Sequence, residues 1–293
     1  MNNMVYQIPK LFPTPAHENL VICVSGVGVT KEFSTLITNI IPDLEFVGKS
    51  QCFPLYYYEP ASDRKKRNVN SNQTQFAVDD GEPSLNYRQQ DGISDFILQS
   101  AETRFGKDAR VTKEDIFYYV YGILHSPEYR TAYSNDLKKM LPRIPLVENI
   151  QDFRKFSAAG RKLAELHLNY ESTPPYSGVI VSGADSENFK VQKMRFPKKD
   201  QKDTIIYNSK ITISNIPDKA YRYIINGKSA IEWIMERYQQ TQIHPDTRIK
   251  NDPNDWSKAT GNPRYILDLL LSIINVSVQT VDIVEKLPKL KFE

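Results

Sequence analysis

The stretch at residues 111–130 reads VTKEDIFYYVYGILHSPEYR, and its central part is apolar on every side. Thr112, followed three residues later by Asp115, is typical of a capped helix start, where acidic side chains also suit the positive end of the helix. Because residues 116–124 leave no polar face, we expect this helix to lie in the interior of the fold. The Ser126–Pro127 pair predicts that a second helix begins directly after it.

Short apolar and β-branched runs predict strands on both sides of this helix. Before it, runs bounded by turn residues predict strands within 19–29, 34–39, 44–47 and 52–59. After it, we expect two further strands that pair with each other, at 189–196 and 204–214.

Helical spacing and capping residues predict the other helices. Apolar residues recur with helical spacing at Ile93, Phe96, Ile97 and Ala101, and again along 152–171. A Ser229-x-x-Glu232 capping box predicts a helix at 229–239, and Asn262–Pro263 opens a last helix that ends near Glu285. Between these two helices, we expect Trp256 to anchor the turn NDPNDW at 251–256.

The order of strands, helices, a strand pair and helices predicts an α+β fold rather than repeating βαβ units. Residues 60–90 are polar and lack periodicity, which is typical of a long loop that is functional or disordered. We expect one module with a β-rich part at 1–60, a mobile basic and polar loop at 61–90, a helical block at 91–172, a second small β unit at 173–228 and C-terminal helices at 229–293.

Cysteine usage and the N-terminal sequence indicate a soluble, cytoplasmic protein. Cys23 and Cys52 lie in apolar runs and are expected to be free thiols in a reducing compartment. The first residues, MNNMVYQIPKLFPTP, are too polar and too rich in proline for a secretory signal. The longest apolar run, YILDLLLSIINVSV, contains Asp268 and Asn275 and is too short to span a bilayer, so we expect no membrane contact.

The net charge of +3 is too small to prove a polyanionic partner, but the basic residues are clustered. DRKKR at 63–67 has four bases in five positions, and KVQKMRFPKKDQK at 190–202 has six bases against one acid. Such patches can supply contacts to phosphates. Either patch taken alone is also typical of a solvated loop or strand edge.

Motifs for catalytic chemistry are incomplete in this sequence. SGVGV at 25–29 lacks the third glycine of a dinucleotide fingerprint, because Lys31 stands there, and a turn between strands is favoured. TPPY at 173–176 resembles a motif of amino-methyltransferases, but Thr173 is a poor acceptor for the target amine. PDLEFVGK at 42–49 has Val47 where a metal-dependent nuclease needs a lysine. The sequence contains no G-x-x-x-x-G-K-[ST] phosphate loop and no G-x-S-x-G nucleophile elbow.

The histidines show no spacing that is typical of metal ligands. They are His17, His125, His167 and His244. His125 ends a predicted helix and His167 lies on an amphipathic face, so capping or satisfied burial is the favoured interpretation. We therefore expect no metal site, no cofactor and no catalytic residue in this chain.

Several runs in a fixed order carry a resemblance to a known family. They are NLVICVSG, DLEFVGKSQCFPLYYYE, TKEDIFYYVYGILHSPEYR, DLKKMLPRIP, FSAAGRKLAELHLNYE, MRFPKK with TIIYNSKITISNIP, AYRYIINGKSAIEWIMERYQ, and NDPNDWS with NPRYILDLLLSIINVSVQTV. The series covers roughly residues 17–288. It resembles the C-terminal specificity domain of type ISP restriction-modification enzymes and of related proteins labelled DEAD/DEAH-box helicases.

The resemblance implies a role in bacterial defence. In that family one polypeptide joins a nuclease, a helicase-like ATPase, an adenine methyltransferase and a terminal target-recognition domain. This chain resembles the recognition part alone, which implies sequence-specific binding of double-stranded DNA and no catalysis of its own. Its implied partners are duplex DNA and the methyltransferase and helicase modules of a parent polypeptide. The alternative is a protein-docking module that couples those two modules with little DNA contact.

Residue type and position predict the DNA contacts. Lysines and arginines would fix the register on the phosphates, and a few loop side chains would read base edges. The predicted contacts are Arg64, Lys65, Lys66 and Arg67 in the loop, Lys193, Arg195, Lys198 and Lys199 in the second β unit, and Ser25, Lys49, Ser50 and Gln51 at strand ends of the first.

Overall fold

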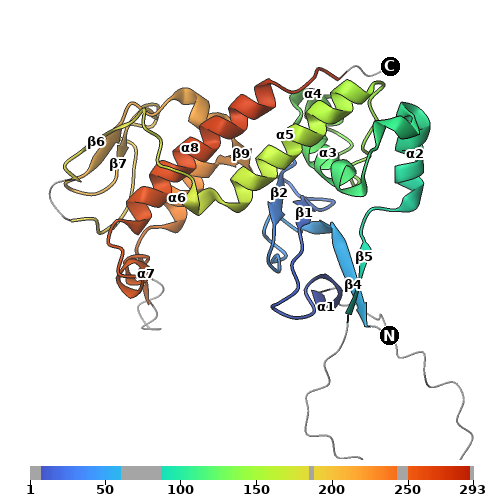
Figure 1. Ribbon diagram of the computed structural model, residues 1–293. Coiled ribbons are helices and arrows are strands. Elements are labelled where there is room, and N and C mark those ends of the chain that lie inside the picture. Colours follow the sequence, from blue (N-terminus) through green and yellow to red (C-terminus); the bar gives the residue numbers. More distant parts are fainter. Residues whose placement is uncertain (1–7, 61–86, 185–187, 243–249, 291–293) are drawn as a thin grey trace, which may run out of the picture.

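The computed structural model describes residues 8–60, 87–184, 188–242 and 250–290 (Figure 1). The described residues build two large hydrophobic cores and one small cluster. The first core is formed mainly by the N-terminal strands and the helices up to position 168, and the second mainly by residues 191–281. Helix α5, Ile150–Leu168, and helix α8, Tyr265–Glu285, pack against each other between the cores. Small antiparallel sheets and helices follow one another, so the predicted α+β class is confirmed.

The N-terminal strands form a three-stranded sheet and a separate ribbon. In the sheet, β1 (Val21–Val24) lies between β2 (Thr35–Thr38) and β3 (Gln51–Pro54) and is antiparallel to both. In the ribbon, β4 (Tyr56–Pro60) pairs with β5 (Tyr87–Asp91), and the short helix α1 (Ile8–Leu11) packs against β4. Alternate residues of β1 point to opposite faces, so that Ile22 and Val24 join the first core while Val21 and Cys23 pack with Val47.

Two predictions for this region were wrong in part. Residues 44–47 form turns instead of a strand, because the Asp43 side chain accepts a hydrogen bond from the N–H of Glu45 and Gly48 follows with a left-handed φ of +79°. The loop predicted at 61–90 ends earlier, since residues 87–91 form β5. Positions 61–86 lie outside the described residues.

The all-round apolar segment forms α3, Lys113–His125, in which every residue from 116 to 125 except Val120 is buried. Its predicted capping box is confirmed, because the N–H of Asp115 donates to Thr112 Oγ1 at 3.0 Å and the N–H of Thr112 donates to Asp115 Oδ2 at 3.1 Å. The second helix, α4 (Pro127–Ala132), begins at once with Ser126 as its N-cap, as predicted.

Replacing Thr112 with alanine is expected to lower the free energy of unfolding by about 1 kcal/mol, because the N–H of Asp115 loses its acceptor. Urea unfolding of the variant measures this loss. Thr103→Ala on α2 is the matched control, since the Thr103 hydroxyl donates to a carbonyl of its own exposed helix and caps nothing. An equal loss in both variants would contradict the role of the cap.

Helices α3 and α5 approach each other closely enough to exclude any side chain at two glycines. A Cβ atom on Gly160 would lie 1.8 Å from the carbonyl oxygen of Tyr118, and one on Gly122 would lie 2.3 Å from that of Phe156. The two helices therefore pack backbone against backbone, and the surrounding core is filled by large aromatic rings. Tyr119 stacks on Phe153 with ring centroids 4.7 Å apart.

Helix α2, Asp95–Phe105, contradicts part of the predicted apolar face. Ala101 is fully buried and Ile93 packs against the first core, as expected, but Phe96 is 72% exposed and Ile97 is 43% exposed. Ala101, Leu98 and Phe105 pack against the first core, so the helix buries these residues in place of Phe96 and Ile97.

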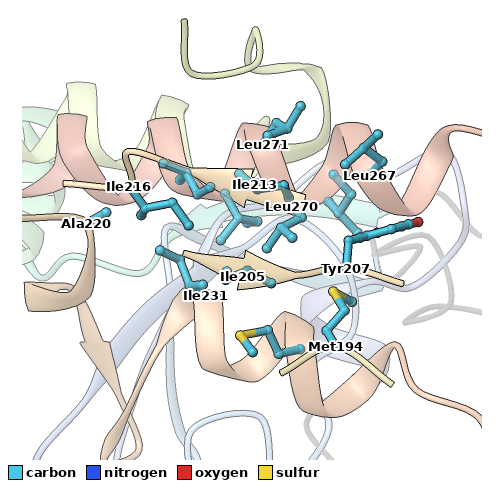
Figure 2. Packing of buried hydrophobic residues seen from close by; sticks show 14 of the residues in the cluster. Met194, Ile205, Tyr207, Ile213, Ile216, Ala220, Ile231, Leu267, Leu270 and Leu271 are labelled. Carbon is cyan, nitrogen blue, oxygen red and sulfur yellow. The ribbon is translucent and has the colours of Figure 1, made fainter. Parts of the chain in front are cut away.

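The second core is built from short strands beneath α8 (Figure 2). β8 (Thr212–Ser214) lies between β6 (Ile180–Ser182) and β7 (Ile205–Ile206), antiparallel to both. The predicted pairing of 189–196 with 204–214 is reduced to a single bridge between Arg195 and Ile206, because the segment 204–214 folds back and pairs with itself. Side chains from these strands meet Leu267 and Leu270 of α8 in the interior.

Shorter elements complete this half of the chain. They are the hairpins β9 (Ile224–Ile225) with β10 (Lys228–Ser229) and β11 (Thr241–Gln242) with β12 (Lys250–Asn251), and the helices α6 (Ala230–Arg237) and α7 (Asn254–Ala259). The capping box predicted at the start of α6 is confirmed, since Ser229 and Glu232 bond each other's backbone N–H groups.

The expectation that Trp256 anchors the turn before α8 was wrong. Trp256 is 58% exposed, and the anchor is Asn254, which is 4% exposed. The amide of Asn254 accepts from the N–H of Val191 and donates to the carbonyl of Val191, both at 2.8 Å. The Asn254 amide thus gives both the N–H and the carbonyl of Val191 a hydrogen-bond partner, and these two bonds fix the turn.

Helix α8 is longer than the apolar run seen in the sequence. Its 21 residues have an 18-residue stretch of mean hydropathy 1.6, which by length and composition alone is enough to cross a membrane. Within the fold, 67% of that stretch is buried against protein. This burial accounts for the apolar composition, because most of the helix surface packs against other parts of the protein instead of facing solvent.

Candidate nucleic-acid interface

The four contact residues predicted in the first β unit separate into two kinds. Ser25 and Ser50 are buried, and their hydroxyls are used inside the fold. Ser25 Oγ donates to the carbonyl of Val47 at 3.2 Å, and Ser50 Oγ accepts from the N–H of Val47 at 3.0 Å. Lys49 and Gln51 are exposed beside them. The two serines thus stabilise the turn around Val47, and a partner could reach only Lys49 and Gln51.

Lys49 is held in an uncommon backbone conformation. Its φ is +48°, in the left-handed region, and its carbonyl oxygen would lie 2.2 Å from a Cβ atom on Gly26. The turn therefore packs directly on the glycine that ends the β1 segment. Because this turn is tightly packed, the backbone of Lys49 is fixed, and so is the point from which its side chain extends.

The second predicted group forms an exposed basic row. Lys193, Arg195, Lys198 and Lys199 are all exposed, and Met194 between the first two is buried in the second core. The backbone of Arg195 is fixed by two hydrogen bonds to Ile206, of 3.1 Å and 2.8 Å. None of these four cations forms an ion pair with another residue of the described chain. Their charges are therefore available to a partner.

The remaining predicted contacts, Arg64, Lys65, Lys66 and Arg67, lie outside the described residues. The described residues on either side of positions 61–86, Pro60 and Tyr87, pair with each other at the end of the β4–β5 ribbon. The structure does not bring Lys49 and the basic row of the second β unit into contact.

Sequence reasoning missed a third basic group around Trp233. Lys31, Lys228 and Arg237 each lie within 5.6 Å of the centre of this indole ring. No sequence signal could have found the group, because Lys31 comes from the opposite end of the chain and only the fold brings it to α6.

The favoured interpretation of the two central histidines, satisfied burial, is confirmed for His167. One of its ring nitrogens lies 2.7 Å from the hydroxyl of Tyr121 and the other lies 3.0 Å from that of Thr280, so it links α3, α5 and α8. Burial, helped by the charge of Arg130, lowers the pKa of His167 to about 3. His125 is also buried, with Nδ1–H donating to the carbonyl of Tyr121, and burial holds the pKa of His125 well below its usual value.

These histidines predict that acid destabilises the fold. Between pH 6.5 and about 3, His167 binds a proton in the unfolded chain but not in the folded one. Stability is therefore full above pH 6.5 and falls as the pH is lowered, by up to about 1.4 kcal/mol per pH unit for each such histidine. Urea unfolding at pH 7.0 and pH 5.5 measures the slope. His167→Gln keeps groups that can bond Tyr121 and Thr280 and should remove the share of one histidine from the slope, leaving that of His125. An unchanged slope would contradict this assignment.

Among the residues that the structure describes, no three His, Cys, Asp or Glu side chains come together in a way that could hold a metal ion. Cys23 and Cys52 face each other across β1 and β3 as free thiols, with their sulfur atoms 3.7 Å apart. The predicted contacts that are exposed, namely Lys49, Gln51 and the basic row, are cations and one amide, which suit contacts to phosphate and to base edges.

Residues 1–269 match the family of type ISP C-terminal specificity domains, which confirms the resemblance seen in the sequence. No curated protein is significantly similar to the chain. Solved structures of three enzymes are similar over nearly its whole length. A nuclease-deletion mutant of the type ISP restriction-modification enzyme LlaGI, in complex with a DNA substrate mimic, is 38% identical with a TM-score of 0.74, and the match covers 98% of this chain and 23% of that one.

The other two similar structures also contain DNA. The ATP-dependent type ISP restriction-modification enzyme LlaBIII bound to DNA is 37% identical with a TM-score of 0.79, over 99% of this chain and 17% of that one. The DrdV–DNA complex is 29% identical with a TM-score of 0.76, over 99% of this chain and 27% of that one. The chain thus spans about a quarter or less of the length of these enzymes.

Proposed function

Because the chain belongs to the family of type ISP C-terminal specificity domains, we propose that it binds double-stranded DNA and recognises a specific base sequence in it. The observation that carries the proposal is the match of 98% of the chain to one part of LlaGI, a restriction-modification enzyme solved with a DNA substrate mimic. In this proposal the chain supplies target recognition for a longer restriction-modification polypeptide.

The charge distribution supports this function. The basic row Lys193, Arg195, Lys198 and Lys199 is exposed and has no ion pair within the described part of the chain. Contacts from such residues to phosphates fix the position and register of a protein on the duplex. Gln51 beside Lys49 is the kind of side chain that reads a base edge, since its amide can donate and accept at once.

We further propose that the chain carries no catalytic group, metal or cofactor of its own. Cleavage, methyl transfer and ATP hydrolysis would then reside in other parts of the parent polypeptide. The proposal follows from the incomplete catalytic motifs in the sequence. Such a polypeptide would act on DNA in the cytoplasm, in keeping with the free thiols Cys23 and Cys52.

A second candidate function is docking to the methyltransferase or helicase parts of the same polypeptide. One observation favours it. Several large apolar side chains of the first β unit are exposed, and exposed apolar surface of this kind is typical of protein interfaces. They are Ile40 at 68%, Ile41 at 52%, Leu44 at 68%, Phe46 at 37% and Phe53 at 44%.

Titration of the isolated chain with fluorescent duplex DNA at two salt concentrations separates these functions. DNA recognition predicts binding whose affinity falls steeply as salt increases, because each phosphate contact releases about 0.9 of a counterion. A folded chain that shows no binding at either salt concentration would overturn the DNA-binding proposal and leave docking as the better one.

A further inference from the structure

Trp233 lies where the two cores meet, and its ring is fixed in place. Its Nε1–H donates to the carbonyl of Ile225 at 2.7 Å, which ties α6 to strand β9. The turn after β9 reaches the first β unit at the residue before β2, because the N–H of Asn226 donates to Ser34 Oγ at 2.8 Å. The indole is partly exposed at this junction. It therefore offers a rigid aromatic surface to side chains from both halves of the chain.

Three basic side chains from three separate segments gather on this ring. Lys31 Nζ lies 5.6 Å from the ring centroid, Lys228 Nζ lies 5.1 Å from it, and the guanidinium carbon of Arg237 lies 5.3 Å from it. Each distance is within the roughly 6 Å over which an aromatic face attracts a cation. The ring thus gathers cations that would otherwise repel one another.

The positive charge of this group is only partly balanced. Glu236 forms an ion pair with Lys228, and that hydrogen bond, together with the charges of Arg237 and Lys31, holds the pKa of the Glu236 carboxyl below its usual value. Lys31 and Arg237 form no ion pair within the described parts of the chain, although Glu32 follows Lys31 directly. Lys31 and Arg237 therefore lie at the surface close enough to act on Glu236 electrostatically, but neither is joined to it by an ion pair.

The turn that carries Lys49 packs against two of the segments that build this group. A Cβ atom on Gly48 would lie 3.5 Å from Val29 and 3.9 Å from Asn226 Oδ1, so this turn packs between the segment that leads to Lys31 and the β9–β10 turn. Lys49 follows Gly48 and is exposed. Lys49 is therefore an exposed cation on a turn that adjoins the segment before Lys31 and the β9–β10 turn.

We propose that Lys31, Arg237 and Lys49 bind phosphates of the DNA backbone, with Trp233 as the platform that positions the first two. This inference rests on the proposed DNA-binding function and adds a phosphate site at the junction of the two cores. A phosphodiester backbone suits the arrangement because its charges recur at regular spacing, whereas a single small anion would meet only one or two of these cations. Bound phosphate would also relieve the repulsion among them.

The test uses the double variant Lys31→Gln with Arg237→Gln in the full chain, titrated with duplex DNA over a range of salt concentrations. The slope of log affinity against log salt is negative, and loss of two phosphate contacts should reduce its magnitude by about 1.8, which corresponds to roughly 60-fold weaker binding at 0.1 M salt. The charge-preserving variant Lys31→Arg with Arg237→Lys should bind like the wild type.

Lys107→Gln with Lys162→Gln is the matched control, because it removes two exposed charges from the helical block. The thermal unfolding midpoint of each variant confirms that its fold is intact. If the wild type binds and the Lys31–Arg237 variant has the same slope as this control, the inference is overturned and the proposed function stands. If the wild type itself does not bind, both are overturned.

Discussion

Replacing Gly160 with alanine is expected to lower the free energy of unfolding by about 3 kcal/mol, the upper part of the range for overpacking a core. The new Cβ atom would lie 1.8 Å from the carbonyl oxygen of Tyr118, and backbone on both sides of the contact leaves no flexible side chain to move. Alanine by itself favours a helix by about 1 kcal/mol over glycine, so any net loss has to come from the clash. Urea unfolding measures the change.

Lys162→Ala on the same helix is the matched control for Gly160→Ala. Lys162 is exposed, and its replacement should change stability by less than about 0.5 kcal/mol. If Gly160→Ala were as stable as this control or more stable, α3 and α5 could not pack backbone against backbone as described. The same reasoning applies to Gly122, which meets the carbonyl of Phe156.

Neutralising the basic row is expected to weaken DNA binding more than any other change considered. If Lys193, Arg195, Lys198 and Lys199 each contact a phosphate, replacing all four with glutamine should reduce the magnitude of the negative slope of log affinity against log salt by about 3.6. That loss corresponds to a decrease in affinity of roughly 10³-fold or more at 0.1 M salt. Titrations with labelled duplex DNA at several salt concentrations measure both quantities.

A matched variant separates this effect from a change in total charge. Lys107, Lys155, Lys162 and Lys258 are exposed in other elements, and replacing all four with glutamine removes the same charge. We expect that variant to keep most of the wild-type slope. Equal slopes for the two quadruple variants would contradict a localised interface on the second β unit.

Elements with strong local signals could be predicted from the sequence. The Thr112 capping box, the Ser126–Pro127 start of α4 and the Ser229 capping box depend on residues within four positions of each other. All three are present in the structure. The all-round apolarity of residues 116–124 also predicted their burial, because a helix without a polar face has to be covered on every side.

Features that depend on distant partners could not be predicted. The segment 189–196 forms only one bridge, because a residue pattern does not say which neighbour a strand will meet. The turn before α8 is held by Asn254, which bonds the distant backbone of Val191, whereas Trp256 is exposed. The close approach of Gly122 to α5 gives no signal in either helix alone.

In the candidate interface, too, some residues could be predicted from local sequence and others depend on the fold. Exposed cations of the basic row follow from a local pattern in which Lys193 and Arg195 alternate with buried Met194. Ser25 and Ser50 were predicted as contacts because they are small polar residues at strand ends. In the structure both are buried, and their hydroxyls bond the backbone of Val47. The cations around Trp233 required the whole fold, since Lys31 and Arg237 are about two hundred positions apart.

The central claim is that this chain recognises a specific duplex sequence, and selection from a random pool tests it most directly. Duplexes with a randomised centre would be incubated with the chain at about 0.15 M salt, where weak non-specific contacts are largely screened. The bound fraction would then be sequenced. We predict that one short motif is enriched over several rounds and that a duplex carrying it competes better than a scrambled one. A bound pool with the same composition as the input would contradict sequence recognition by this chain.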